Sequence, residues 1–370
     1  MPLECSNYKK CPFGRECKTD CILYSPFHCK RRDRSPGACD GCTNWRHCRF
    51  NKYKYSPEDA WNDYRYTLVD SRQGVNLTVK QAKDIADVIA PLLKQGLSPY
   101  QILASHPELG ISEKTLYNYI EGDVFHEIAG ITALDLRRQV SRKISKKKSK
   151  SFKKRADNKY LIGRNYNDYK QYIDDNPNAL ITQMDTVYNN ETTGPFIQTF
   201  KFIPSGILFA LYQTEKTSTA MKNGVDTLEN ILGNDVFRKY VNVLLTDRGS
   251  EFYAATDMET GVDGTTRTRV FYCDPMQSGQ KGSIENNHIQ LRYILPKQTD
   301  LVSLGLTDQD ALNLVLSHLN SAPIEKFGGK SPLEVTSFMY HDLYEKLISY
   351  GIKEIEKDRI VLKPYLLKNR

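Results

Sequence analysis

The chain has 370 residues, which is enough for two or more domains, and a formal net charge of +8. It contains no apolar stretch of about twenty residues, so the sequence predicts no membrane span. The polar, cysteine-rich N-terminus is unlike a secretory signal peptide, and we expect a cytoplasmic protein.

The positive charge is concentrated in one segment. Residues 137–155 contain eleven Lys and Arg and no Asp or Glu. Without those eleven, the 52 Lys and Arg of the chain fall to 41, against 44 Asp and Glu. A concentrated basic run of this kind indicates a polyanionic partner.

The first 50 residues hold eight of the nine cysteines but too few large apolar residues to build a core. This pattern predicts a small zinc-binding module, because thiolate bonds to Zn²⁺ can hold such a segment together. The eight thiolates suffice for one or two structural sites. One site would contain the Cys39-x-x-Cys42 pair with Cys29 and Cys48, and the other four cysteines of the segment would form the second. A disulfide-bonded or loosely ordered segment is the alternative. The candidate ligands are Cys5, Cys11, Cys17, Cys21, Cys29, Cys39, Cys42 and Cys48.

Residues 51–138 contain a succession of helix starts. Ser56 and Pro57 begin the first helix, with Ser56 as its N-cap. Apolar side chains recur along this helix, and its buried face is expected to hold Tyr53, Trp61, Tyr64 and Leu68. Further capped helices are expected to begin near Thr78, Ser98 and Ser112.

The last two of these helices form a helix-turn-helix pattern, typical of DNA-binding domains. Leu116 and Ile120 are expected to face the core. An ordinary helical bundle is the alternative, and the basic segment downstream favours DNA. The side chains expected to face the DNA groove are Lys114, Thr115, Tyr117 and Asn118.

The basic segment is expected to have two parts. Its start would finish a helix running from about Val124, and the Ser/Lys tract after Ile144 would be a flexible linker whose charges contact DNA phosphates. A solvated tether between domains is the compatible alternative. The predicted phosphate contacts are Arg142, Lys143, Lys146, Lys147, Lys148, Lys153, Lys154 and Arg155.

From about residue 178 the pattern changes to that of an α/β domain. We expect strands and helices in this order: strands 179–188, 195–203 and 206–213, helix 217–232, strands 240–246 and 269–273, and a helix from Gly282. This order predicts a mixed sheet and a ribonuclease-H-like fold. A helix at 308–320, a helix capped by Ser331 and a terminal strand from Ile360 are expected to follow.

Three acidic residues stand at the ends or centres of these elements. Asp247 follows the apolar run 241–245, Asp185 lies inside the first strand, and Glu285 lies in the first turn of the helix after Gly282. They are 62 and 38 residues apart along the chain.

Carboxylates brought together from two strands and a helix can hold two Mg²⁺ or Mn²⁺ ions. Such a pair activates the nucleophile and stabilises the leaving oxygen in phosphodiester cleavage. Structural carboxylates are far commoner than catalytic ones, and Glu251, Asp257 and Asp274 are the alternative ligands. Of these, Glu251 is expected to lie outside the metal ligands or to be exposed.

Five short motifs surround and follow the three acids: Gln183-Met184-Asp185-Thr186-Val187, Leu245-Thr246-Asp247-Arg248-Gly249-Ser250-Glu251-Phe252, Gln280-Lys281-Gly282-Ser283-Ile284-Glu285-Asn286-Asn287-His288, Leu295-Pro296-Lys297-Gln298-Thr299-Asp300 and Gly329-Lys330-Ser331-Pro332. Together they resemble the insertion-sequence-thirty family of DDE transposases, over roughly residues 29–335. Arg248, Gly279 and Ile324 depart from the residues usual in that family.

The resemblance implies a metal-binding triad of Asp185, Asp247 and Glu285. It also implies that the protein binds the terminal inverted repeats of an insertion sequence, cleaves DNA to free 3′-hydroxyls and directs their attack on target DNA in the bacterial nucleoid. Two DNA ends must be synapsed, so we expect a homodimer or a higher oligomer. The alternatives are a domesticated transcription regulator with an inactive nuclease fold, and a ribonuclease-H-type nuclease that joins no strands.

A multidomain protein follows from these patterns. The predicted parts are a cysteine-rich zinc-binding module at 1–50, an all-α helix-turn-helix domain at 51–138, a basic linker with a short helix at 139–177, a ribonuclease-H-like (DDE integrase-type) catalytic domain at 178–330 and a C-terminal helical extension at 331–370.

Overall fold

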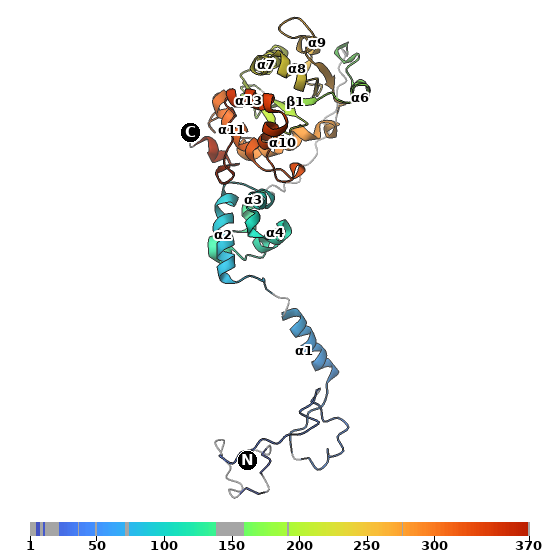
Figure 1. The fold of residues 1–370 in the computed structure, drawn as a ribbon, viewed down its shortest axis with the longest axis vertical. Helices are drawn as coiled ribbons and strands as arrows, with labels where there is room; N and C mark the ends of the chain where they lie inside the picture. The colour runs from blue at the N-terminus through green and yellow to red at the C-terminus, as the bar shows by residue number, and fades with distance from the viewer. Residues whose placement is uncertain are drawn as a thin grey trace. The chain divides into compact units, whose positions relative to one another are not determined.

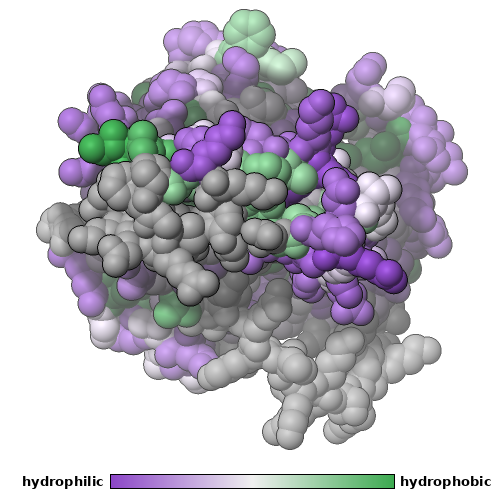
Figure 2. All heavy atoms as spheres, turned by 90° about the horizontal axis from the view of Figure 1, so that it is seen from below, coloured by the Kyte–Doolittle hydropathy of each residue, from purple (hydrophilic) through white to green (hydrophobic). Residues whose placement is uncertain are grey.

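The computed structural model describes residues 5–7, 10–11, 22–35, 37–48, 50–70, 74–137, 159–190, 192–275 and 277–368 (Figure 1). The chain divides into two units, Met1–Asn76 and Leu77–Arg370. None of the helices described is long and apolar enough to cross a membrane. The boundaries between the five predicted parts stay predictions. On the face drawn in Figure 2, hydrophilic side chains are interspersed with small hydrophobic patches.

In the first unit, helix α1 (Pro57–Asp70) begins where the sequence predicts, and the Asp59 N–H donates to Ser56 Oγ over 3.1 Å. The predicted buried face is wrong, because Trp61 and Tyr64 are each 57 % exposed and Tyr53 is 51 % exposed. The physical reason is the scarcity of large apolar residues before the helix, which leaves this unit little apolar surface to cover these rings.

The second unit begins with the predicted capped helices α2 (Val79–Lys94), α3 (Pro99–Ser105) and α4 (Glu113–Glu121). Their N-caps are the expected Thr78, Ser98 and Ser112, and each side chain accepts a backbone N–H of the first turn. Leu116 and Ile120 are fully buried, as predicted. The helix-turn-helix interpretation itself stays a prediction.

The helix expected from Val124 through Arg137 is wrong. The chain instead forms the four-residue helix α5 (His126–Ala129) and the short 3-10 turn η2 (Ala133–Asp135). Gly130 ends α5 because it adopts a left-handed conformation, with φ of 65°, and its N–H donates to His126 O.

The predicted mixed sheet is confirmed. Its strands lie in the order β3-β2-β1-β4-β5, with β1 antiparallel to β2 and parallel to β4. The β2–β3 pair is antiparallel and the β4–β5 pair parallel. The strands are β1 (Ile181–Val187), β2 (Phe196–Phe202), β3 (Leu208–Gln213), β4 (Val243–Thr246) and β5 (Arg269–Tyr272).

Helices cover the sheet, with α10 packed against β1 and α11 against β3 (Figure 1). Phe200, Leu228, Leu291 and Leu316 are among the fully buried side chains of this core. The sequence analysis predicted neither α8 nor α9, and it included α13 only within a C-terminal helical extension. The helices are α6 (Tyr166–Asp175), α7 (Ser218–Leu232), α8 (Asn234–Tyr240), α9 (Ala255–Glu259), α10 (Gly282–Ile294), α11 (Gln309–Ser321), α12 (Pro332–Met339) and α13 (His341–Ser349).

The terminal strand expected from Ile360 is wrong. Residues Pro364–Leu367 form the 3-10 turn η8, which packs against α10 and α11 and buries Leu366 and Leu367. The tail also contacts the end of α2, because the Leu362 N–H donates to the O atom of Gln95, the C-cap of that helix, over 2.8 Å. An apolar cluster at the end of the chain therefore fills a gap between helices instead of extending the sheet.

Candidate active site

The two aspartates arrive from neighbouring parallel strands. Gln183 of β1 pairs with Leu245 of β4; Asp185 lies two residues further along β1, and Asp247 lies two residues after Leu245, directly after the end of β4. Because parallel strands end at the same edge of a sheet, this register brings both carboxylates to one place. Asp185 is largely buried and Asp247 about half exposed.

A lysine joins the two carboxylates. Lys281 Nζ lies 2.8 Å from Asp185 Oδ2 and 3.3 Å from Asp247 Oδ2, and the Lys281 side chain is only 8 % exposed. Burial alone would lower the pKa of Lys281, but the charges of Asp185 and Asp247 outweigh it and raise the pKa above its ordinary value. Lys281 was not among the predicted site residues. Its position four residues before Glu285 is the sequence signal that would have suggested it.

Helix α10 packs against β1 and carries Glu285 in its first turn. The buried Ile284 N–H donates to Gln183 Oε1 over 2.9 Å, which fixes the first turn of the helix on β1. His288 Nδ1 lies 3.8 Å from Asp185 Oδ2. Lys281 and His288 thus both approach Asp185, and Glu285 lies between them at helical spacing on the same face of α10.

The carboxylates do not close into one cluster. Within the part of the chain that the structure describes, no three His, Cys, Asp or Glu side chains are grouped closely enough to hold a metal ion. Asp185 and Asp247 are instead bridged by the ammonium of Lys281, with half-buried Glu285 on the facing helix.

His288 is a neutral neighbour of the site. Burial lowers the pKa of His288 to about 4, despite the opposing effect of Asp185. Its Nε2 is 3.0 Å from Thr199 Oγ1, and the Thr199 hydroxyl donates to Asp185 O, also over 3.0 Å. The histidine therefore supports the backbone that carries Asp185.

Arg248 and Gln280 hold the alternative ligand Asp274. Arg248 donates to Asp274 Oδ1 over 2.9 Å and to Cys273 O over 3.0 Å. Gln280 Nε2 donates to Asp274 Oδ2 over 3.1 Å. Both carboxylate oxygens of Asp274 therefore accept hydrogen bonds, and Arg248 is held by Asp274 and the Cys273 carbonyl. Cys273 is buried as expected, and burial raises its thiol pKa to about 12.

The alternative ligands Glu251 and Asp257 differ in exposure. Asp257 is exposed and Glu251 is buried, so an exposed Glu251 is wrong. Lys216 Nζ pairs with Glu251 Oε1 at 3.1 Å, which makes this burial tolerable. A Cβ at Gly249 would lie 2.6 Å from Glu251 Oε2 and 2.9 Å from Asp247 Oδ1. A side chain at position 249 would therefore displace one of these two carboxylates.

Comparison with known proteins identifies relatives of the chain, although no family model matches it. The transposase for insertion sequence element IS1086 of Cupriavidus metallidurans is 36 % identical over 94 residues, 25 % of each chain. The transposase InsI for element IS30A of Escherichia coli is 35 % identical over 92 residues, 25 % of this chain and 22 % of that one. Over about a quarter of its length, the chain is similar to these IS1086 and IS30A transposases.

The matches with IS1086 and IS30A span only about a quarter of the length of those relatives. A longer match, with the transposase for element IS4351 of Bacteroides fragilis, is 22 % identical over 273 residues, 69 % of this chain and 76 % of that one.

Solved structures with similarity include integrase catalytic cores. The BIV integrase core is 24 % identical with a TM-score of 0.31, covering 44 % of this chain and 97 % of that one. The HTLV-2 integrase core in complex with magnesium is 17 % identical with a TM-score of 0.31, covering 42 % of this chain and 94 % of that one.

The predicted DNA contacts on α4 differ in exposure. Lys114 and Asn118 are exposed, whereas Thr115 and Tyr117 are half-buried. Thr115 Oγ1 is 2.7 Å from the capping Ser112 Oγ. The predicted phosphate contacts in the basic segment lie outside the described residues; they are Arg142, Lys143, Lys146, Lys147, Lys148, Lys153, Lys154 and Arg155.

The described cysteines of the first unit are free thiols. The Cys42 N–H donates to Cys39 O over 3.1 Å, which closes a turn at the predicted Cys39-x-x-Cys42 pair. Hydrogen bonds from the backbone of Arg32 and Arg31 lower the pKa of the Cys29 thiol. Cys17 and Cys21 lie outside the described residues, and the zinc sites stay a prediction.

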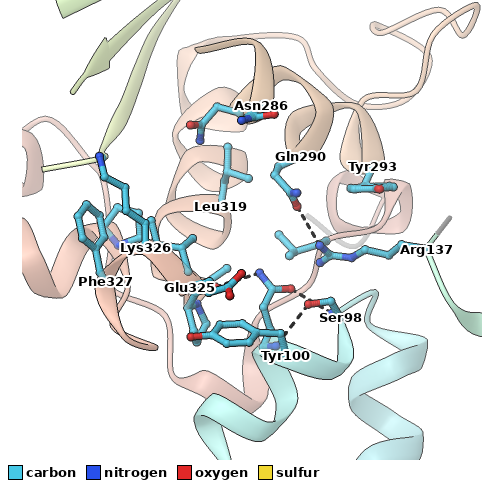
Figure 3. A pocket seen from close by; sticks show the side chains of 18 of the residues that line it. Ser98, Tyr100, Arg137, Asn286, Gln290, Tyr293, Leu319, Glu325, Lys326 and Phe327 are labelled. Carbon is cyan, nitrogen blue, oxygen red and sulfur yellow. Dashed lines mark hydrogen bonds between the residues drawn. The ribbon is translucent and has the colours of Figure 1, made fainter. Parts of the chain in front are cut away.

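A cavity of about 640 Å³ lies between helices α3 and α4 on one side and helix α10 on the other (Figure 3). Arg137 crosses it, donating to Gln290 Oε1 over 2.8 Å and lying over the Tyr293 ring at 4.9 Å. Burial, aided by nearby Lys326, lowers the pKa of Lys201 in its wall to about 7. Arg137 therefore links the start of the basic segment to the helix that carries Glu285.

Proposed function

We propose that the chain is a DNA transposase that binds the ends of its insertion sequence and catalyses metal-dependent strand cleavage and strand transfer. One observation carries the proposal: Asp185 and Asp247, from adjacent parallel strands, share one ammonium, and the helix packed against β1 carries Glu285 in its first turn. The names of the related transposases support the same activity.

The residues fit a divalent cation. Asp185, Asp247 and Glu285 are hard oxygen donors, which Mg²⁺ and Mn²⁺ prefer. Asp185 and Asp247 share the one ammonium of Lys281, so this pair of carboxylates keeps excess negative charge and already holds a cation. When bound, two such metal ions would activate the attacking oxygen and stabilise the leaving one.

The protein's part in the reaction is to hold these ligands rigidly. β1 and β4 fix the aspartates, and the bond from Ile284 to Gln183 fixes the first turn of α10. Neutral His288 and Thr199 brace the backbone of Asp185. Fixed ligands lower the cost of orienting the reacting groups.

The remaining predictions complete the proposal. Exposed Lys114 and Asn118 on α4 would contact the terminal repeats, and the basic segment 137–155 would contact phosphates. One or two zinc ions would order the cysteine-rich segment. A homodimer or larger assembly would bring two ends together.

A strand-transfer assay with oligonucleotides carrying the element's ends tests the proposal. Wild-type protein with Mg²⁺ or Mn²⁺ is expected to cleave the ends and join them to target DNA, whereas Asp185→Asn, Asp247→Asn and Glu285→Gln bind the ends without cleaving. Asp174→Asn, at an exposed acid of α6, is the control with unchanged activity. A triad variant that folds, binds and cleaves at the wild-type rate would falsify the proposal. DNA binding without cleavage by wild-type protein would favour a regulator, and cleavage without joining a simple nuclease.

A further inference from the structure

We propose that the ammonium of Lys281 is a tethered cation, which occupies the metal position in the metal-free protein and must leave Asp185 and Asp247 before Mg²⁺ binds. The inference rests on the proposed function, because it assumes that these carboxylates are metal ligands. It assigns Lys281 a positioning role, acting through the two aspartates.

The amine of Lys281 lies between the two carboxylates. Lys281 Nζ contacts one oxygen of each aspartate, at 2.8 and 3.3 Å, while its side chain is 8 % exposed. An ammonium buried to this extent is stable only when it is paired. The contact therefore satisfies the lysine and the aspartates together.

Without the lysine, the two aspartates would face each other with no counter-charge between them. Register brings Asp185 and Asp247 together whether or not a cation is present, and Asp247 also shares the Gly249 turn with Glu251. Like charges at such distances repel one another. Lys281 offsets that repulsion, so the metal-free sheet keeps its ligands in register.

The amine of Lys281 can leave the two aspartates without moving helix α10. Lys281 precedes Gly282 at the N-terminus of α10, and the helix is held separately by the bond from Ile284 to Gln183. A lysine side chain has four flexible methylenes, so its end can swing toward the solvent-exposed side of Asp247 while the backbone stays in place. Metal loading would then require a side-chain rotation and no refolding.

Competition between tethered and free cations predicts effects of opposite sign. Removing the amine should lower the thermal stability of the metal-free protein, because the aspartates lose their counter-charge. It should also strengthen Mg²⁺ binding, because no ion pair has to be broken first. A lysine with a purely structural role would weaken both folding and metal binding when replaced.

The experiment measures Mg²⁺ binding to the full chain by isothermal titration calorimetry and thermal unfolding in EDTA and in Mg²⁺. Lys281→Met keeps the length and apolar stem of the side chain. Since a hydrogen bond to a charged group contributes about 1.5–3 kcal/mol, the Kd for Mg²⁺ should fall by about tenfold or more. The Tm in EDTA should fall, and the Mg²⁺-induced rise in Tm should exceed that of the wild type.

Three further variants complete the design. Lys239→Met removes an ion pair with Asp342, between α8 and α13, and should leave the Kd for Mg²⁺ unchanged. Lys281→Arg keeps a cation and should keep weaker, wild-type-like binding. Lys281→Gln takes the place of Lys281→Met if that variant does not fold.

The outcomes separate the two proposals. A Kd for Lys281→Met equal to or higher than that of the wild type overturns the tethered cation, provided that Asp185→Asn abolishes binding. If Asp185→Asn binds Mg²⁺ as the wild type does, the carboxylates are not the metal ligands and the proposed function fails with it.

Discussion

Replacing Gln183 by Leu should loosen the attachment of the first turn of helix α10 to strand β1. Gln183 is 7 % exposed, and its Oε1 accepts the N–H of fully buried Ile284 over 2.9 Å. Leucine fills similar space but offers no acceptor, so a buried N–H loses its partner at a cost of about 1–3 kcal/mol. Because Glu285 follows Ile284 directly, its position should become less precise.

Two measurements check this expectation. Urea unfolding of the full chain should show a lower midpoint for Gln183→Leu, corresponding to a loss of about 1–3 kcal/mol in the free energy of unfolding. Strand cleavage should fall by about a hundredfold, as expected for a misplaced catalytic group. Gln183→Glu keeps an acceptor oxygen and should recover part of the stability. Gln171→Leu, at an exposed glutamine of α6, is the matched control. Wild-type stability and cleavage in Gln183→Leu would show that this bond does not position α10.

Three other expectations concern stability and DNA contact. Burial lowers the pKa of His318 to about 4 from 6.5, so the unfolded chain binds more protons between these values and stability should fall as pH drops through that window; His318→Asn should flatten the curve measured by urea unfolding, and an unchanged slope would exclude His318. Gly96→Ala should lower Tm more than Gly264→Ala, because both have positive φ but only at Gly96 would a Cβ meet Leu362 O, at 2.8 Å; equal shifts would contradict this. Lys114→Ala should weaken binding of the element's ends and reduce its salt dependence, and an unchanged salt slope would remove Lys114 from the interface.

Local signals in the sequence predicted local structure well. The caps at Thr78, Ser98, Ser112 and Ser331 each begin a helix at the expected place. A cap works through bonds within one turn of the chain, so its effect can be read from a few neighbouring residues. The alternation and run lengths of apolar residues likewise predicted the five strands and their mixed sheet.

Expectations that depend on distant partners were less successful. The burial of Trp61 was wrong because a helical pattern does not show whether a partner surface exists. The tail around Leu366 was apolar, but its choice of a 3-10 turn over a strand is made by the gap that α10 and α11 leave. Lys281 was missed for the same reason, since its contact with Asp185 and Asp247 exists only after the strands and α10 meet.

The most direct test of the central claim is the rate of metal-dependent cleavage of a duplex that carries the element's end, compared between wild-type protein and Asp247→Asn. We expect cleavage by the wild type only when Mg²⁺ or Mn²⁺ is present, and none above the protein-free background for Asp247→Asn that binds the same duplex. Equal cleavage by both proteins, or wild-type cleavage that persists in EDTA, would contradict a carboxylate-held metal site in this protein.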